Sequence, residues 1–227
     1  MRSYDQYCGL ARALDVVGDR WTLLIVRELL IHDGARYTDL RRGLPGIATN
    51  LLADRLRELE ANGIVSREEA PPPVATTLFR LTTRGEALRP VVEAIGQWGQ
   101  PLLAGTAPDA EFRSHWLVLP LERMLADHAP AAPPITIQLL TGDQPMLVET
   151  VDGRVAVRPG TAEQPTATLE GPPGLVMEVL VHRLDLATAR RRGLRVRGEP
   201  AAVQRVAPAA VDSSDVPRAA GQALAGG

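Results

Sequence analysis

The sequence contains no lysine, because all 25 basic residues among its 227 are arginine. Arginine forks onto phosphate and guanine, but GC-rich codons also favour it. The arginines therefore indicate a GC-rich bacterial genome, and only their positions can point to a function. The formal net charge of −2 excludes a chain that coats nucleic acid with an overall positive charge.

Cysteine and long apolar runs are scarce as well. The single cysteine, Cys8, excludes an intrachain disulfide framework and is typical of a reducing compartment. No apolar run reaches the roughly 18 residues of a membrane span, because Arg27 and Glu28 interrupt Leu23–Ile31. The N-terminus shows no hydrophobic signal region. We therefore expect a cytoplasmic protein with no membrane partner.

Residues 37–63 predict a helix, a tight turn and a second helix. Glycine and proline at 43, 45 and 46 break the first helix. The second helix runs from about Thr49 to Ala61, and its leucines at 52, 56 and 59 form one apolar face. Two strands, 64–70 and 76–82, follow with a proline-rich tip between them. A hairpin directly after such a helix pair is typical of a winged helix-turn-helix, a DNA-binding module.

The motifs at Ala13–Leu29, Arg36–Arg42 and Leu81–Gly85 carry a family resemblance. With the helix pair, they make residues 5 to about 103 resemble the HxlR family of winged helix-turn-helix regulators. The resemblance implies a homodimeric bacterial transcription regulator that binds double-stranded operator DNA. It places Thr49, Asn50 and Arg55 near base edges and Arg36, Arg41 and Arg42 near phosphates, and Arg80 joins the expected DNA-binding residues.

Two departures from the family pattern affect these expectations. The family usually has a serine helix cap where this chain has Ala48, so Thr49 could cap the second helix instead. The wing tip, Pro71–Ala75, lacks the arginine often found there, which weakens the case for insertion of the wing into the minor groove.

The pattern changes after a boundary at Ala104–Pro108. A helix over 110–127, kinked at Pro120, precedes strands at 135–139, 146–151, 155–157, 167–169 and 194–197. Asp152-Gly153 predicts a tight hairpin between two of the strands. Further helices are predicted at 173–184, 185–192 and 200–206. The chain from Ala207 onward is rich in small and polar residues and predicts disorder.

This order of elements, and the segment Asp185–Glu199 above all, resembles a sterol carrier protein domain. The predicted architecture is therefore a mainly α winged helix-turn-helix domain (1–104), an α+β sterol-carrier-like domain (109–207) and a tail (208–227). The resemblance implies a hydrophobic tunnel for an apolar small-molecule effector. The candidate ligand-binding residues are Leu139, Leu147, Val155, Val176, Met177 and Leu180. Periodicity alone fits a filled core equally well.

The remaining chemistry-bearing residues support weaker hypotheses. Cys8 could sense oxidants, with Arg12 one turn away, although free cysteine is more often buried and inert. The basic run around Arg190–Arg197 favours a solvated surface over a binding site. The four histidines (32, 115, 128 and 182) show no metal-ligand spacing, and no nucleophile elbow or phosphate-binding glycine loop is present.

We therefore expect no cofactor, no metal and no enzymatic activity. Two alternatives to an effector-controlled regulator remain. One is a redox-sensing regulator that acts through Cys8. The other is a carrier or enzyme of apolar compounds that uses the winged helix only as a dimerisation platform.

Overall fold

The computed structural model describes residues 3–69, 76–105 and 110–209. The chain divides into two compact units. The first contains residues 1–123, 142–144 and 157–159, and the second contains 124–141, 145–156 and 160–227. We expected the second domain to begin near residue 109, whereas residues up to Arg123 are grouped with the first unit.

The first unit opens with helices α1 (Gly9–Val17) and α2 (Thr22–Ile31). A short strand β1 (Ala35–Arg36) leads into α3 (Tyr37–Gly43), and α4 (Thr49–Ala61) follows the turn. The structure therefore confirms the predicted helix pair. The expectation that Thr49 caps α4 is wrong: the N-cap is Ala48, whose side chain has no oxygen to accept a hydrogen bond, and Thr49 is already the first helical residue.

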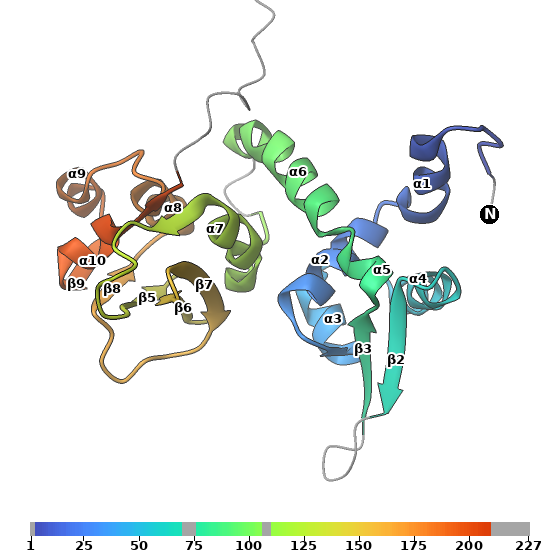
Figure 1. Cartoon of the computed structure of the whole chain (residues 1–227), viewed down its shortest axis with the longest axis horizontal. Helices are drawn as coiled ribbons and strands as arrows, with labels where there is room; N and C mark the ends of the chain where they lie inside the picture. The colour runs from blue at the N-terminus through green and yellow to red at the C-terminus, as the bar shows by residue number, and fades with distance from the viewer. Residues whose placement is uncertain (1–2, 70–75, 106–109, 210–227) are drawn as a thin grey trace, which may run out of the picture. The chain divides into compact units, whose positions relative to one another are not determined.

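The predicted wing is also present (Figure 1). Strands β2 (Val65–Glu69) and β3 (Thr77–Leu81) pair antiparallel, and β1 adds to β3. The expectation about the wing tip concerns residues that lie outside those described. The chain after the wing is divided into two helices, α5 (Thr83–Glu86) and α6 (Arg89–Gly99). Pro90 explains the division, because proline suits the first turn of a helix and cannot continue one.

A 3₁₀ turn, η1 (Gln100–Gly105), ends this part of the described chain. The core beneath the helix pair is formed by buried residues from α2, α3, α4 and the wing, among them Ile25, Leu29, Leu40, Leu52, Leu56, Leu59 and Phe79. Burial of such side chains contributes about 1.5–3 kcal/mol each. This core fixes α3 and α4 relative to each other, and so it positions the surface that they share.

The single helix expected over 110–127 is wrong. The chain forms the 3₁₀ turn η2 (Ser114–Leu117), then α7 (Val118–Met124), then strand β4 (Leu125–Asp127). Pro120 lies in the first turn of α7, where its missing N–H removes no helical hydrogen bond. Proline is therefore accommodated at a helix start and produces no kink. Leu119 of α7 joins the core of the first unit.

The second unit contains most of a five-stranded sheet of order β7-β6-β5-β8-β9, and residues 157–159 of β7 are grouped with the first unit. Its strands are β5 (Thr136–Leu140), β6 (Met146–Val151), β7 (Arg154–Pro159), β8 (Ala167–Glu170) and β9 (Arg195–Gly198). Strands β5 and β8 pair in parallel, whereas β5 with β6 and β8 with β9 pair antiparallel. Asp152 and Gly153 form the predicted hairpin, both with the positive φ that such turns require.

Three helices complete this unit: α8 (Pro173–Leu180), α9 (Leu186–Arg191) and α10 (Pro200–Arg205). Helix α8 ends four residues earlier than predicted, and His182 beyond it adopts a φ of 55° that a helix cannot continue. An unpredicted strand, β10 (Val206–Pro208), pairs antiparallel with β4. None of the described helices is long and apolar enough to cross a membrane.

Candidate nucleic-acid interface

The turn between α3 and α4 is held by a contact between the two helix starts. The Tyr37 hydroxyl donates to the main-chain oxygen of Thr49 at 2.5 Å. Between them, Gly46 adopts a φ of +87°, which glycine tolerates without strain. The first turn of α4 is thereby fixed, and Thr49 and Asn50 on it are exposed. In DNA-binding helix-turn-helix modules this turn is the part of the recognition helix that contacts base edges.

Three of the predicted phosphate contacts lie at the ends of α3, where they are exposed: Arg36 at its start, and Arg41 and Arg42 in its last turn. The Arg42 side chain is 79% exposed, and its nearest carboxylate, that of Asp39, lies 3.9 Å away. An exposed pair at this separation contributes little. These guanidinium groups are therefore available to bind phosphate.

Arg55 and Arg80 differ from these three, because each lies between two carboxylates. The Arg55 side chain is only 22% exposed; its Nη2 atom lies 3.3 Å from Asp19, and the group also pairs with Glu58. Arg80 donates to Glu68 at 2.8 Å and pairs with Asp33, and this pairing raises its pKa above the ordinary value. Neither guanidinium is free, so we leave both out of the DNA contacts proposed below.

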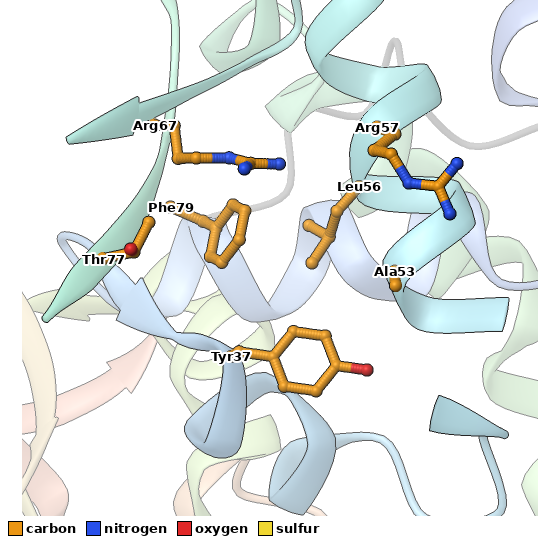
Figure 2. A pocket seen from close by; sticks show the side chains of 7 residues that line it. All are labelled: Tyr37, Ala53, Leu56, Arg57, Arg67, Thr77 and Phe79. Carbon is orange, nitrogen blue, oxygen red and sulfur yellow. The ribbon is translucent and has the colours of Figure 1, made fainter. Parts of the chain in front are cut away.

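A pocket of about 360 Å³ opens between the helix pair and the wing (Figure 2). Its lining is Tyr37, Ala53, Leu56, Arg57, Arg67, Thr77 and Phe79. Arg67 extends over the ring of Phe79, with its guanidinium carbon 5.4 Å from the ring centroid, and also pairs with Glu60 at 3.1 Å. The residues come from four separate elements, so no local sequence pattern could reveal the pocket.

A polar cluster inside the first unit was also missed by the sequence analysis. Glu28 of α2 is fully buried, and its Oε2 lies 2.8 Å from Nε2 of His115. His32 completes a group in which the three potential ligand atoms lie within 4.8 Å of one another. The expectation of no metal-ligand arrangement rested on spacing along the chain, which cannot detect His115, 87 residues after Glu28.

Burial and hydrogen bonding act in opposite directions in this cluster. Burial raises the pKa of the Glu28 carboxyl, but the His115 hydrogen bond and the Arg27 charge outweigh it, so the net pKa is lowered. Burial, followed by the neighbouring His115, lowers the pKa of His32. At neutral pH the cluster therefore contains a carboxylate beside a neutral His32 imidazole, the protonation states that metal ions require.

The candidate ligand-binding residues lie in the core of the second unit. Five of the six are buried, namely Leu139, Leu147, Val155, Val176 and Leu180, and Met177 is partly exposed. A hollow of about 280 Å³ lies beside them, lined by Val179, His182, Leu184, Asp185, Leu186, Val203 and Gln204. None of the six lines this hollow. A ligand in this hollow would therefore contact Val179 at the C-terminal end of α8, and not the six candidate residues.

Cys8 and several apolar side chains are exposed in the first unit. The expectation of a buried thiol is wrong, because Cys8 is exposed just before α1. On α1, Leu10 and Leu14 are also exposed, with Tyr7 before the helix. Helix α6 buries none of its described residues and exposes Val91, Ile95 and Trp98.

A short helix pair with an exposed first turn, flanking arginines and a two-stranded wing defines a winged helix-turn-helix protein. Residues 16–106 match a family model described as HxlR-like helix-turn-helix. The uncharacterized HTH-type transcriptional regulator YvaP of Bacillus subtilis (strain 168) is 34% identical over 87 residues, 38% of this chain and 80% of YvaP. The chain therefore belongs to the HxlR-like helix-turn-helix family of transcriptional regulators.

Other similar proteins include the HTH-type transcriptional regulator YodB of the same organism. It is 36% identical over 87 residues, covering 38% of this chain and 76% of YodB. Among solved structures, the reduced form of the redox regulator HypR is 32% identical and covers 41% of this chain and 92% of HypR, with a TM-score of 0.39. The family model ends at residue 106, so its match does not extend into the second unit.

Proposed function

We propose that the protein is a dimeric regulator whose helix α4 enters the major groove of an operator. The exposed first turn of α4 carries this proposal, because Thr49 and Asn50 present hydroxyl and amide groups that can bond base edges. Arg36, Arg41 and Arg42 would bind the phosphates on either side. The test is binding of the full-length protein to genomic fragments, followed by footprinting of the fragment retained at high salt.

The exposed apolar faces support the dimer. Ile95 and Trp98 on α6 are 50% and 75% exposed, and Leu10 on α1 is 70% exposed. Contiguous apolar faces of this kind typically mark a protein interface. A two-fold dimer would place two copies of α4 one helical turn of DNA apart, roughly 34–36 Å. Footprints should therefore show a palindrome with this spacing.

We further propose that the second unit binds an apolar effector. The order of its elements, from β4 through the Asp152-Gly153 hairpin to α10, supports the resemblance to sterol carrier proteins. The candidate ligand residues of the core, Val176 and Leu180 among them, would be reached through the hollow beside Leu186 and Val203. An effector should change operator affinity by roughly 5- to 150-fold, and operator DNA should change effector affinity equally.

Leu186→Trp provides the test of this effector site. The larger ring should fill the hollow and abolish the response to co-purifying apolar compounds, while basal operator binding stays unchanged. Mass spectrometry of the purified protein identifies the compounds to be tested. An unaltered response in Leu186→Trp would exclude the hollow as the route to the core.

The exposure of Cys8 favours a second candidate, a redox-sensing regulator. YodB and HypR, which this chain resembles, have been solved in reduced and in oxidised or diamide-treated forms. An exposed thiol can react with an oxidant once it ionises. Under this alternative a mild oxidant changes operator affinity, and Cys8→Ser abolishes the change.

A further inference from the structure

Three side chains of the first unit converge on one point. Glu28 and His32 lie one helical turn apart at the end of α2, and His115 approaches them from η2. Ligands about 2.0–2.1 Å from a tetrahedral zinc ion stand roughly 3.3 Å from one another. The 2.8 Å separation of Glu28 and His115 and the 4.8 Å limit on the group bracket this value. The three atoms are therefore close enough together to share one ion.

A hydrogen-bonded network without a metal explains only part of this cluster. It accounts for Glu28, which accepts from His115, and for His115 itself. It does not account for His32, whose imidazole makes no hydrogen bond within the described parts of the chain. This imidazole is tilted against the His115 ring at a centroid distance of 5.4 Å. A metal ion would give the His32 ring nitrogen a partner.

The surroundings hold the potential ligands in place. One carboxylate oxygen of Glu28, Oε1, accepts from Trp116 at 2.9 Å and from Arg27 at 2.6 Å. The other, Oε2, is therefore the oxygen that faces the histidines. The Gln144 amide lies 3.4 Å from Nδ1 of His115 and can orient that ring. A Cβ at Gly43 would collide with Oε2, so glycine there makes room for the carboxylate. Such supporting contacts typically orient metal ligands.

We propose that Glu28, His32 and His115 form a binding site for one divalent transition-metal ion of the zinc class. Two imidazole nitrogens and one carboxylate oxygen suit zinc and cobalt, whereas calcium and magnesium prefer all-oxygen sites. A fourth ligand would be water. None of the three residues is among the proposed DNA contacts, so the metal site can be tested independently of the proposed function.

Charge sets the expected strength of the site. The Arg27 guanidinium on Oε1 repels a cation, which should make binding weaker than at a closed structural zinc site. Arg27→Gln keeps a hydrogen-bond donor and removes the charge. This variant should therefore bind the metal more tightly than the wild type, a result that a purely structural network does not predict.

The experiment titrates full-length, tag-free protein with Zn²⁺ by calorimetry and with Co²⁺ by visible absorption. We expect one ion per chain and cobalt bands typical of a four-coordinate site. His32→Asn and His115→Gln should each weaken binding by more than the about 10- to 100-fold that loss of a supporting residue costs. His128→Gln, which lies outside the cluster, is the matched control and should bind as the wild type does.

His32→Asn keeps the test decisive if His115→Gln fails to fold, because His32 is only partly buried and lies at a helix end. Absence of Zn²⁺ and Co²⁺ binding by the wild type would overturn the proposal. So would binding that His32→Asn leaves unchanged, since the metal would then lie elsewhere.

Discussion

The two units differ in how completely each covers its own apolar side chains. Among the residues that the structure describes, the exposed large apolar side chains all lie in the first unit except Val151. Four exposed arginines, two in each unit, have different environments. Arg41 and Arg42 in the first unit are exposed without a close partner, whereas Arg195 and Arg197 in the second pair with Glu170 at 2.9 and 3.5 Å.

This contrast indicates which unit depends on partners. The second unit buries its apolar residues, and the arginines above bind its own carboxylates. The first unit leaves an apolar face on α6 and basic groups on α3 without partners in the chain itself. A second copy and DNA phosphates are the partners whose chemistry matches these two surfaces.

The largest effect is expected from a charge on the apolar face of α6. Trp98→Asp should convert the dimer to a monomer, because an aspartate buried in an apolar interface lacks a partner. Loss of the two-site linkage should reduce operator affinity by about 100-fold or more. Sedimentation and fluorescence anisotropy measure the two effects. Val151→Asp is the control, and an equal effect of both variants would remove the contrast between the units.

Sequence reasoning succeeded where the signal is local. The helix pair and the Asp152-Gly153 hairpin were predicted because glycine, proline and apolar spacing act within a few residues. It failed where distant residues meet. The pairing of β10 with β4 and the approach of His115 to Glu28 depend on packing that no local pattern encodes.

The candidate DNA surface shows the same division. The exposure of Asn50 follows from its place on the first turn of a helix whose other face is apolar. The pairing of Arg55 with Asp19 does not follow from any such pattern, because the two residues lie on different segments. The family resemblance placed Arg55 at the DNA by position alone, without information on its neighbours in this chain.

The next largest effect tests whether α4 contacts bases. Asn50→Ala removes an amide that can bond an adenine edge, and should cost about 1–3 kcal/mol on the operator. Binding to random DNA should change much less. Competition assays with both DNAs measure the difference. An equal loss on both DNAs would mean that Asn50 does not discriminate among bases. It would also weaken the proposal that α4 is the helix that contacts base edges.

A smaller effect tests whether the second unit is held by its own ion pairs. Arg205 on α10 bonds both carboxylate oxygens of Asp127, at 2.7 and 2.9 Å, and this lowers the Asp127 pKa. Because the folded pKa is lowered, the stabilisation is complete above the ordinary value of about 3.9 and is lost as pH falls through the folded value. Protection of the β4–β10 amides against hydrogen exchange should therefore decrease below about pH 4.

The Asp127→Asn variant separates this pair from general acid unfolding. It should lower the protection of β4 and β10 at neutral pH and remove most of its pH dependence. Asp185→Asn is the control, because Asp185 is exposed and caps α9 through Thr188, away from these strands. If the wild type and Asp127→Asn lose protection in parallel as pH falls, the Arg205 pair does not stabilise this sheet.

The smallest effect compares two exposed arginines, one in each unit. Arg42→Ala should weaken binding to operator and random DNA alike and flatten the salt dependence by about one unit of slope, because one phosphate contact and its released counterion are lost. Arg195 is similarly exposed, 70% against 79% for Arg42, but its charge is neutralised by Glu170. Arg195→Ala should therefore leave the slope unchanged. A slope that falls equally in both variants would mean that overall charge governs binding, and that the unpaired state of Arg42 carries no information about where DNA binds.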